Sequence, residues 1–294
     1  ALHLLEIFLL ISAIYNYTSS GDSTYLFYHK LADPIDASAV YLSLIIALAV
    51  LVTIFDNELK PFVKGSSLMI HAVFLILLSI RNIMIALPLV LLIYFLISKK
   101  GNIKKYVFFG GLAALTVFCI PQVSHRFKDA VGYHPEHIWA TKVTDTTAFN
   151  GSTLRARLWK YGYEMQFNSL GNTVFGLGPG ETQVLLDEKI TLSNMYIGDG
   201  SSEDKGFLGY NFHNEYIQKL TETGLIGLFL LLFYIGFKIR KSIRYKDQRA
   251  FTMLLLFSIA FCTESYLSTQ IGIYTFLTFM ILIPNNDKIQ QHSY

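Results

Sequence analysis

Long apolar tracts constrain this chain more than any other feature of its sequence. They run near residues 1–15, 38–55, 66–80, 82–98, 105–121, 223–237, 250–263 and 268–284. A helix needs about 20 mainly apolar residues to cross a bilayer, and fewer where flanking side chains reach the interface. The tracts are apolar on all sides, as helices that face lipid must be. The sequence therefore predicts an all-α, multi-pass transmembrane helical bundle with about eight spans in this chain.

Composition also indicates a membrane protein. Of the 294 residues, 52% are hydrophobic and only 15% are charged, whereas soluble domains carry about 25% charged residues. The net charge of +3 is too small to indicate a nucleic-acid partner. Cys119 and Cys262 both lie in apolar tracts. We therefore expect them to pack as small hydrophobic residues and to form neither a disulfide nor a metal site.

Two basic loops predict the orientation of the chain in the membrane. One comprises residues 99–105 and the other residues 238–249. Lys and Arg are enriched in cytoplasmic loops, and an even number of predicted crossings separates these two, so we place both in the cytoplasm. Residues 122–222 then lie on the opposite side, which is the periplasm in a Gram-negative cell. A connection of about a hundred residues far exceeds the usual 4–6 and is typical of a functional segment.

The sequence thus predicts four segments. They are N-terminal transmembrane helices at 1–121, a large periplasmic loop with the candidate site motifs at 122–222, C-terminal transmembrane helices at 223–285 and a cytoplasmic tail at 286–294. The chain starts at Ala1 inside an apolar tract and lacks the features of a signal peptide, so we expect further helices to precede it.

The first candidate site residue is Arg81, in the sequence Ser79-Ile80-Arg81-Asn82. The apolar stretch 66–98 is too long for one span and predicts two spans with a tight turn at Arg81, on the side of the large loop. An arginine near the bilayer costs about 2 kcal/mol or more unless it faces a polar cavity or reaches the headgroups. Arg81 is therefore either an anion contact at a cavity mouth or an interfacial anchor.

A second candidate group lies in the sequence Leu154-Arg155-Ala156-Arg157-Leu158-Trp159-Lys160. Helical spacing places Arg155 and Trp159 on one face and turns Arg157 elsewhere. Guanidinium groups suit phosphates because they stay charged and donate in a planar fork. Arg155 is the stronger candidate for an anion ligand, and Arg157 and Lys160 are weaker ones. The alternative is a solvated basic face with Trp159 as a buried anchor.

The third candidate is His213-Asn214, just before the chain re-enters the membrane at the tract 223–237. Histidine is the side chain best suited to move a proton near neutral pH. The alternative is a histidine that caps a helix or forms a hydrogen bond in a loop. Taken alone, the pair does not decide between these roles.

In combination, these motifs resemble the O-antigen ligase family, which includes related polymerases and bacterial O-oligosaccharyltransferases. The most specific match is His213-Asn214 followed by nine residues and then Gly224. The family's ligases often have a threonine three residues after this glycine, and here that position is Gly227. The departure leaves assignment to the ligases or to the polymerases open.

Other features of the family occur in the same order along the chain, between about residues 35 and 285. They are the turn at Arg81, Arg155 four residues before Trp159, and the glycine-rich stretch 175–180. The last is the segment 263–267, which contains Glu264 and is followed by Gln270 and Gly272. The family has more helices than this chain. The resemblance thus implies an N-terminally incomplete GT-C-like fold.

The resemblance also implies an activity and a location. The expected enzyme is an inverting lipid-linked-oligosaccharide glycosyltransferase, which moves a glycan from an undecaprenyl-diphosphate carrier to a hydroxyl acceptor. In a ligase that acceptor belongs to the lipid A-core. The expected location is the bacterial inner membrane, with the active site facing the periplasm. The resemblance implies no cofactor, no metal and no nucleic-acid partner.

The resemblance assigns expected roles to the candidate residues. His213 and Arg155 are catalytic, with His213 as the base; Arg81, Arg155, Arg157 and Lys160 bind the diphosphate; Asn214, Glu264 and Trp159 support the site. We expect Arg81, Arg155 and His213, far apart in the sequence, to converge on one pocket at the outer leaflet.

Other interpretations of the chain remain open. Within the family, the alternatives are an O-antigen or exopolysaccharide polymerase and a protein O-glycosylation enzyme. From another class, the alternative is a polytopic transporter, although a long external loop that carries the motifs favours a transferase. His71 is expected to be a packed or helix-bonded residue, and His125, His134 and His137 match no known metal-ligand pattern.

Overall fold

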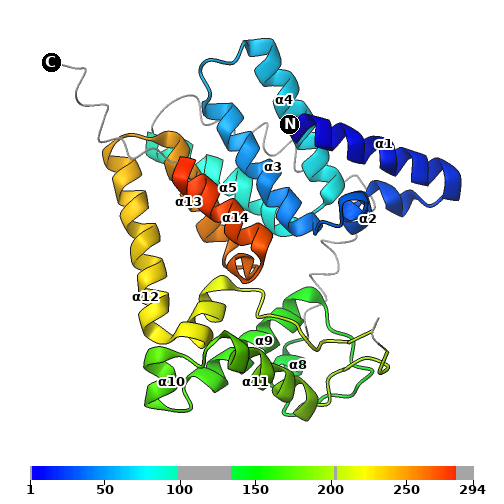
Figure 1. Ribbon diagram of the computed structural model, residues 1–294, viewed down its shortest axis with the longest axis vertical. Helices are drawn as coiled ribbons and strands as arrows, with labels where there is room; N and C mark the ends of the chain where they lie inside the picture. The colour runs from blue at the N-terminus through cyan, green and yellow to red at the C-terminus, as the bar shows by residue number, and fades with distance from the viewer. Residues whose placement is uncertain (1, 99–133, 202–203, 283–294) are drawn as a thin grey trace. The chain divides into compact units, whose positions relative to one another are not determined.

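The computed structural model describes residues 2–98, 134–201 and 204–282 (Figure 1). These residues form helices and the connections between them, and no strand occurs among them. The prediction of an all-α chain is confirmed for this part. The chain divides into two compact units, which we call the bundle unit and the loop unit.

The bundle unit holds the described residues up to 98 together with 238–260 and 270–282. Its helices are α1 (Leu2–Ser20), α2 (Tyr28–Ala32), α3 (Ala39–Phe55), α4 (Pro61–Leu78), α5 (Arg81–Ser98), α13 (Gln248–Ala260) and α14 (Gln270–Leu282). Helix α3 packs against α4, α5, α13 and α14, and 10 of its 17 residues are buried. Ser38 caps its first turn by accepting a hydrogen bond from the Val40 amide.

The loop unit holds the described residues 134–237 and 261–269. Its helices are α8 (Pro135–Trp139), α9 (Gly151–Gln166), α10 (Leu170–Phe175), α11 (Pro179–Leu192), most of α12 (Glu215–Arg244) and a short 3-10 helix (Tyr266–Ser268). Its core lies between α9 and α11. Leu158, Tyr161, Leu186, Ile190 and Phe212 are among the buried side chains there.

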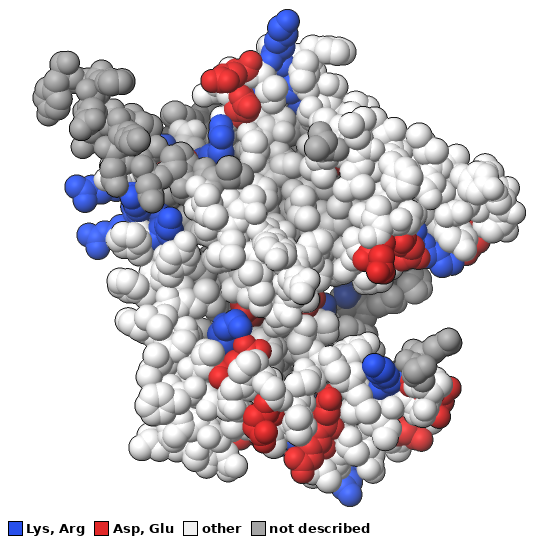
Figure 2. Space-filling view, viewed as in Figure 1, with Lys and Arg blue, Asp and Glu red and all other residues white. Residues whose placement is uncertain are grey.

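Three described helices are long and apolar enough to span a membrane, namely α1, α4 and α12. Residues Tyr28–Ile35, which include α2, meet α3 at a bend of 87°. If these two helical pieces count as one broken span, the number of candidate spans is four. Helices α5, α13 and α14 are apolar but shorter. Residues 223–237 of α12 are uncharged, and Lys241 and Arg244 lie in its last turn; Figure 2 shows basic side chains near that end of the helix. The full set of eight spans stays a prediction, and the tract 105–121 lies outside the described residues.

The predicted tight turn at Arg81 is confirmed. Helix α4 ends at Leu78, and α5 begins at Arg81. Ser79 takes a left-handed backbone conformation (φ +46°), and its amide donates to the carbonyls of Leu75 and Ile76, both at 3.1 Å. This cap ends α4 and lets α5 begin two residues later, so two helices replace one long one.

One prediction about the cysteines is wrong. The side chain of Cys262 is exposed rather than packed. Helix α13 ends at Ala260, and Cys262 therefore belongs to the connection that follows it. Its carbonyl oxygen accepts a hydrogen bond from the Asn214 amide group. Cys119 lies outside the described residues.

A glycine pair breaks helix α12 and fixes the glycine-rich turn against it (Figure 1). Gly224 has φ +67° and ψ −169°, a conformation that essentially only glycine adopts. A Cβ atom there would lie 2.2 Å from the Val174 carbonyl oxygen, and one on Gly176 would lie 2.5 Å from the Gly224 nitrogen. Leu177 and Gly178 donate backbone hydrogen bonds to the carbonyls of Thr221 and Glu222. Steric exclusion of a side chain thus explains why the last position of the His-Asn-x9-Gly motif is a glycine.

Residues 225–244 after this break are long enough to cross the hydrocarbon core, because 20 helical residues span about 30 Å. Residues 215–223 before it form the helical segment that follows His213-Asn214. The break therefore separates the apolar part of α12 from the part that carries the motif.

We predict that Gly224→Ala lowers the apparent Tm of the purified protein by about 5 °C or more, because the new side chain adds backbone strain and a steric clash. Thermal unfolding in detergent, followed by circular dichroism, measures this shift. Gly236→Ala is the matched control on the same helix, since a Cβ atom there meets nothing within 4 Å. Equal shifts for both variants would contradict the close backbone packing at Gly224.

Candidate active site

His213 lies two residues before α12 in a strained backbone conformation. Its φ is +47°, in the left-handed region that residues other than glycine rarely adopt. Its amide donates to the side-chain oxygen of Asn211 at 2.8 Å, which closes a local turn. The ring of Tyr210 lies edge-on, 5.8 Å from the imidazole centre. The position is therefore held by specific contacts rather than by helical geometry.

Glu264 brings a carboxylate to the imidazole of His213 from a segment 51 residues away in the sequence. The His213 Nδ1 atom lies 3.0 Å from one Glu264 oxygen and 3.1 Å from the other. A carboxylate only accepts hydrogen bonds, so Nδ1 carries the hydrogen and donates the hydrogen bond to Glu264. In the neutral ring, Nε2 is then the acceptor. The His213 side chain is 25% exposed and that of Glu264 only 9%, so the imidazole is accessible whereas its partner is buried.

Asn214 joins the start of α12 to the same segment. Its side-chain oxygen accepts from the amides of Tyr216 and Ile217 at 3.0 and 3.1 Å, which caps the helix. Its side-chain nitrogen donates to the Cys262 carbonyl at 3.0 Å. An aspartate could cap the helix but could not donate, which explains why the position needs asparagine.

Three polar residues that sequence reasoning did not single out complete this connection. The Glu215 carboxylate, fully buried, accepts from the Leu267 amide at 2.7 Å. Gln218 accepts from the Phe212 amide at 3.3 Å, and the hydroxyl of Ser265 accepts from the Asn214 amide at 3.1 Å. The signal in the sequence is a polar stripe at helical spacing, Glu215, Gln218 and Glu222, at the start of an otherwise apolar helix.

Trp159 ties helix α9 to the residue before His213. Its indole nitrogen donates to the Phe212 carbonyl at 2.8 Å. Gly162 permits the close approach, because a Cβ atom there would lie 2.7 Å from Ile217 and 3.1 Å from Phe212. Arg155 lies one helical turn before Trp159, so the two side chains start from neighbouring points on the same face.

Only some of the hydrogen-bond donors of the Arg155 guanidinium have a partner within the described protein. Its Nη1 donates to the Gly151 carbonyl at a long 3.4 Å. Its Nε is buried and has no hydrogen-bond partner among the described residues. A buried donor left unpaired costs about 1–3 kcal/mol. An anion that accepts a hydrogen bond from this Nε would remove that cost.

Arg157 and Lys160 lie in different surroundings. The Arg157 side chain is completely buried; its Nε donates to the Tyr161 hydroxyl at 2.6 Å and its Nη1 to the His137 carbonyl. The Lys160 ammonium lies 3.6 Å from Glu164 and 5.9 Å from the centre of the Trp139 ring. Both cations therefore support the packing of α9 within the loop unit.

Arg81 belongs to the bundle unit, whereas Arg155 and His213 belong to the loop unit. The expected convergence of Arg81 with the other two residues stays a prediction. Among the described residues, two groups of histidine and glutamate are close enough to hold a metal ion, and neither includes His213 or Glu264.

The apolar helices and the site define an integral membrane protein that carries a carboxylate-bound histidine next to an arginine-bearing helix. The O-antigen ligase family model matches residues 66–232, more than half of the chain. The chain therefore belongs to the O-antigen ligase family. Membership implies a ligase-like or polymerase-like membrane glycosyltransferase that acts on lipid-linked glycans. No curated protein matches the chain.

We predict that Glu264→Gln lowers the turnover of glycan transfer by about 10²-fold and alters its pH–rate profile. The amide keeps the size of the side chain but no longer stabilises a positively charged imidazole. Initial rates across a pH series measure both effects.

The matched control for this variant is Glu181→Gln, which neutralises an exposed carboxylate at the start of α11. The control should leave the rate and its pH dependence unchanged. If Glu264→Gln also retains the wild-type profile, Glu264 has no part in positioning His213.

Proposed function

We propose that this protein transfers a glycan from an undecaprenyl-diphosphate carrier to a hydroxyl group of the lipid A-core. The observation that carries the proposal is the contact of His213 Nδ1 with the buried Glu264 carboxylate. It leaves Nε2 as an accessible acceptor of the kind a general base needs. The family match supports the substrate class.

In the proposed reaction, His213 Nε2 removes the proton of the acceptor hydroxyl. The acceptor oxygen forms a bond to the anomeric carbon of the glycan. The bond between that carbon and the phosphate oxygen breaks, and its electron pair leaves with the lipid diphosphate. A single displacement of this kind inverts the anomeric configuration. Glu264 stabilises the imidazolium that forms on His213, as a buried carboxylate does in a catalytic triad.

The departing diphosphate needs cationic hydrogen-bond donors where its charge develops. Arg155 is the best supported of them, because its side chain is only partly buried and its Nε has no partner among the described residues. Arg157 also has an unpaired nitrogen, Nη2, but its side chain is completely buried and its Nε and Nη1 are bound within the loop unit. Arg81 is the proposed second contact, from the turn between α4 and α5. Arg157 and Lys160 serve this reaction only indirectly in our proposal, since both hold the loop unit together.

The proposed location is the bacterial inner membrane with the site on the periplasmic face. The basic residues at the end of α12 support this orientation, because Lys and Arg are enriched on the cytoplasmic side. Helix α12 begins next to His213 and ends in these basic residues. The His213 end then lies at the opposite, periplasmic interface.

A polymerase reaction, which joins repeat units, uses the same chemistry with a different acceptor. At position 227 the family's ligases often have threonine, and this chain has glycine. Neighbouring packing explains the difference, because a Cβ atom on residue 227 would lie 1.9 Å from the Thr223 hydroxyl. The glycine therefore reflects packing against Thr223 and does not by itself favour either acceptor.

We predict that His213→Ala lowers glycan transfer by about 10³-fold while the protein still folds and inserts into the membrane. The test uses purified protein in liposomes with a carrier-linked glycan and an acceptor lipid, with electrophoresis of the products. His134→Ala is the control, since this histidine is 59% exposed and belongs to the same unit. Wild-type transfer by His213→Ala would remove His213 as the base.

Cells that carry His213→Ala also distinguish the two acceptors. Long carrier-linked polymers accumulate if the protein is a ligase, because polymerisation continues without attachment. Single carrier-linked repeat units accumulate if it is a polymerase, which would contradict the lipid A-core as acceptor.

We predict that Arg155→Lys lowers turnover by about 10²-fold, because lysine keeps the charge but loses the planar fork of donors. The measurement is the single-turnover rate with saturating carrier-linked glycan. Lys142→Ala, which removes an exposed cation of the same unit, is the control and should leave the rate unchanged. An unchanged rate in Arg155→Lys would limit this arginine to a structural role.

A further inference from the structure

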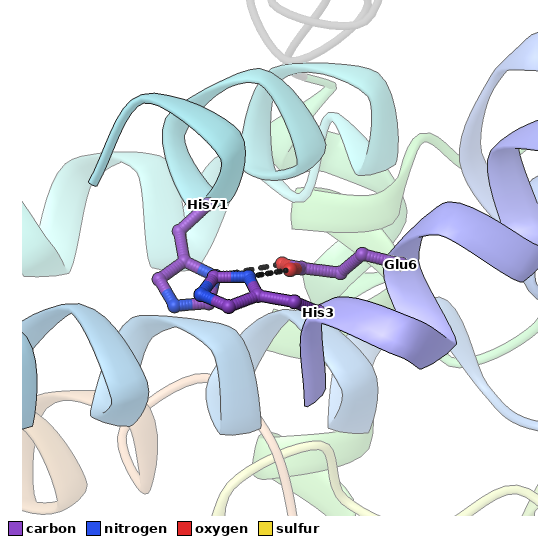
Figure 3. Close-up of side chains that lie close together, drawn as sticks. All are labelled: His3, Glu6 and His71. Carbon is purple, nitrogen blue, oxygen red and sulfur yellow. Dashed lines mark hydrogen bonds and ion pairs between the residues drawn. The ribbon is translucent and has the colours of Figure 1, made fainter. Parts of the chain in front are cut away.

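A buried cluster of titratable side chains lies in the bundle unit, outside the site described above. Figure 3 shows His3 and Glu6 of α1 and His71 of α4, with both imidazoles directed at the Glu6 carboxylate. Glu6 is 1% exposed and His71 3%. His3 stacks on His71 with their ring centres 4.6 Å apart.

The donor atoms of the three side chains converge. His71 Nδ1 lies 2.7 Å from one Glu6 oxygen, and His3 Nδ1 lies 2.9 Å from the other. The ligand atoms all lie within 4.8 Å of one another. In a tetrahedral zinc site, with metal–ligand distances of 2.0–2.2 Å, neighbouring ligand atoms are about 3.4 Å apart. Each ring nitrogen therefore needs to move about 0.5–0.7 Å away from its Glu6 oxygen to reach that spacing.

The second hydrogen bond of the His3 ring is of the kind that a metal-binding histidine makes. Its second ring nitrogen, Nε2, lies 3.0 Å from the hydroxyl of Ser67, one turn before His71 on α4. A histidine that binds a metal through one nitrogen usually donates its other N–H to an acceptor, which fixes the ring. With Nδ1 on the metal, His3 Nε2 donates to Ser67.

The electrostatics of the site favour a bound cation. A carboxylate with 1% exposure in an apolar bundle is costly unless a positive charge lies beside it. In the described residues, the side chains that contact the Glu6 carboxylate are His3 and His71. Two neutral imidazoles and one carboxylate are a donor set that suits Zn²⁺ and related transition metals.

We propose that His3, Glu6 and His71 bind one divalent transition-metal ion, of which Zn²⁺ is the representative. The ion binds in exchange for protons, because each ligating nitrogen and oxygen must be deprotonated. The site joins α1 to α4. The role is structural: α1 buries only Glu6, Leu9 and Ala13, so a metal cross-link strengthens an otherwise small contact.

The test uses the full chain purified in detergent without a polyhistidine tag. Equilibrium dialysis against micromolar ZnCl₂, followed by metal analysis, should give one zinc per chain, and zinc should raise the apparent Tm. Co²⁺ in place of zinc should give the visible absorption of a tetrahedral nitrogen- and oxygen-bound ion. If the wild-type protein binds no zinc and its Tm does not change, the three residues form only a hydrogen-bonded cluster and the proposal is wrong.

Variants locate the ion. Glu6→Gln and His71→Ala should each lose the bound zinc and the shift in Tm. Ser67→Ala keeps all three ligands and should weaken zinc affinity by about 10-fold, which provides a test even if the ligand variants fail to fold.

The second group of the same residue types, His134, Glu136 and His137, supplies the control. His134→Ala should retain the zinc, since this group lies in the loop unit with His134 and Glu136 exposed. Loss of zinc in His134→Ala, with full binding in Ser67→Ala and Glu6→Gln, would place the ion there and overturn the proposal.

Discussion

The contact between His213 and Glu264 is the constraint on which the rest of the candidate site depends. It joins segments 51 residues apart and buries a carboxylate that needs a hydrogen-bond donor. The connection after α13 provides more than this carboxylate. The Phe261 carbonyl accepts from the Glu215 amide at 2.8 Å, and the Cys262 carbonyl accepts from Asn214. The connection and the start of α12 therefore form one hydrogen-bonded assembly, which holds His213 in a backbone conformation that costs about 1–3 kcal/mol.

The His-Asn-x9-Gly motif has a physical explanation at each of its positions. His213 presents the titratable ring, and Asn214 both caps α12 and donates across to the following connection. The nine residues between form the helical segment before the break, and Gly224 makes the break possible. The close contact with Gly176 then attaches α10 and the glycine-rich turn to α12. The spacing is thus the length of one helical segment bounded by a cap and a kink.

Local patterns in the sequence predicted the apolar helices, the turn at Arg81 and the face shared by Arg155 and Trp159, but not the helices α8, α10 and α11 of the loop unit. Each predicted feature depends on residues a few positions apart, which periodicity and capping rules describe. The burial of Arg157 against Tyr161 and His137, and the contact of Glu6 with His71, could not be predicted in this way. Both depend on which helices pack together. His71 is buried, as the sequence interpretation expected, but its contact with Glu6, 65 residues away, could not be seen in the sequence.

The most direct test of the account asks whether His213 and Glu264 act as one unit. The measurement is a double-mutant cycle of glycan-transfer rates for His213→Ala, Glu264→Gln and the variant with both changes. If Glu264 acts only through His213, the double variant turns over at the rate of His213→Ala within about threefold, because residues that act together are not additive. If the two losses multiply instead, Glu264 acts independently of His213 and the pairing is not the basis of the site.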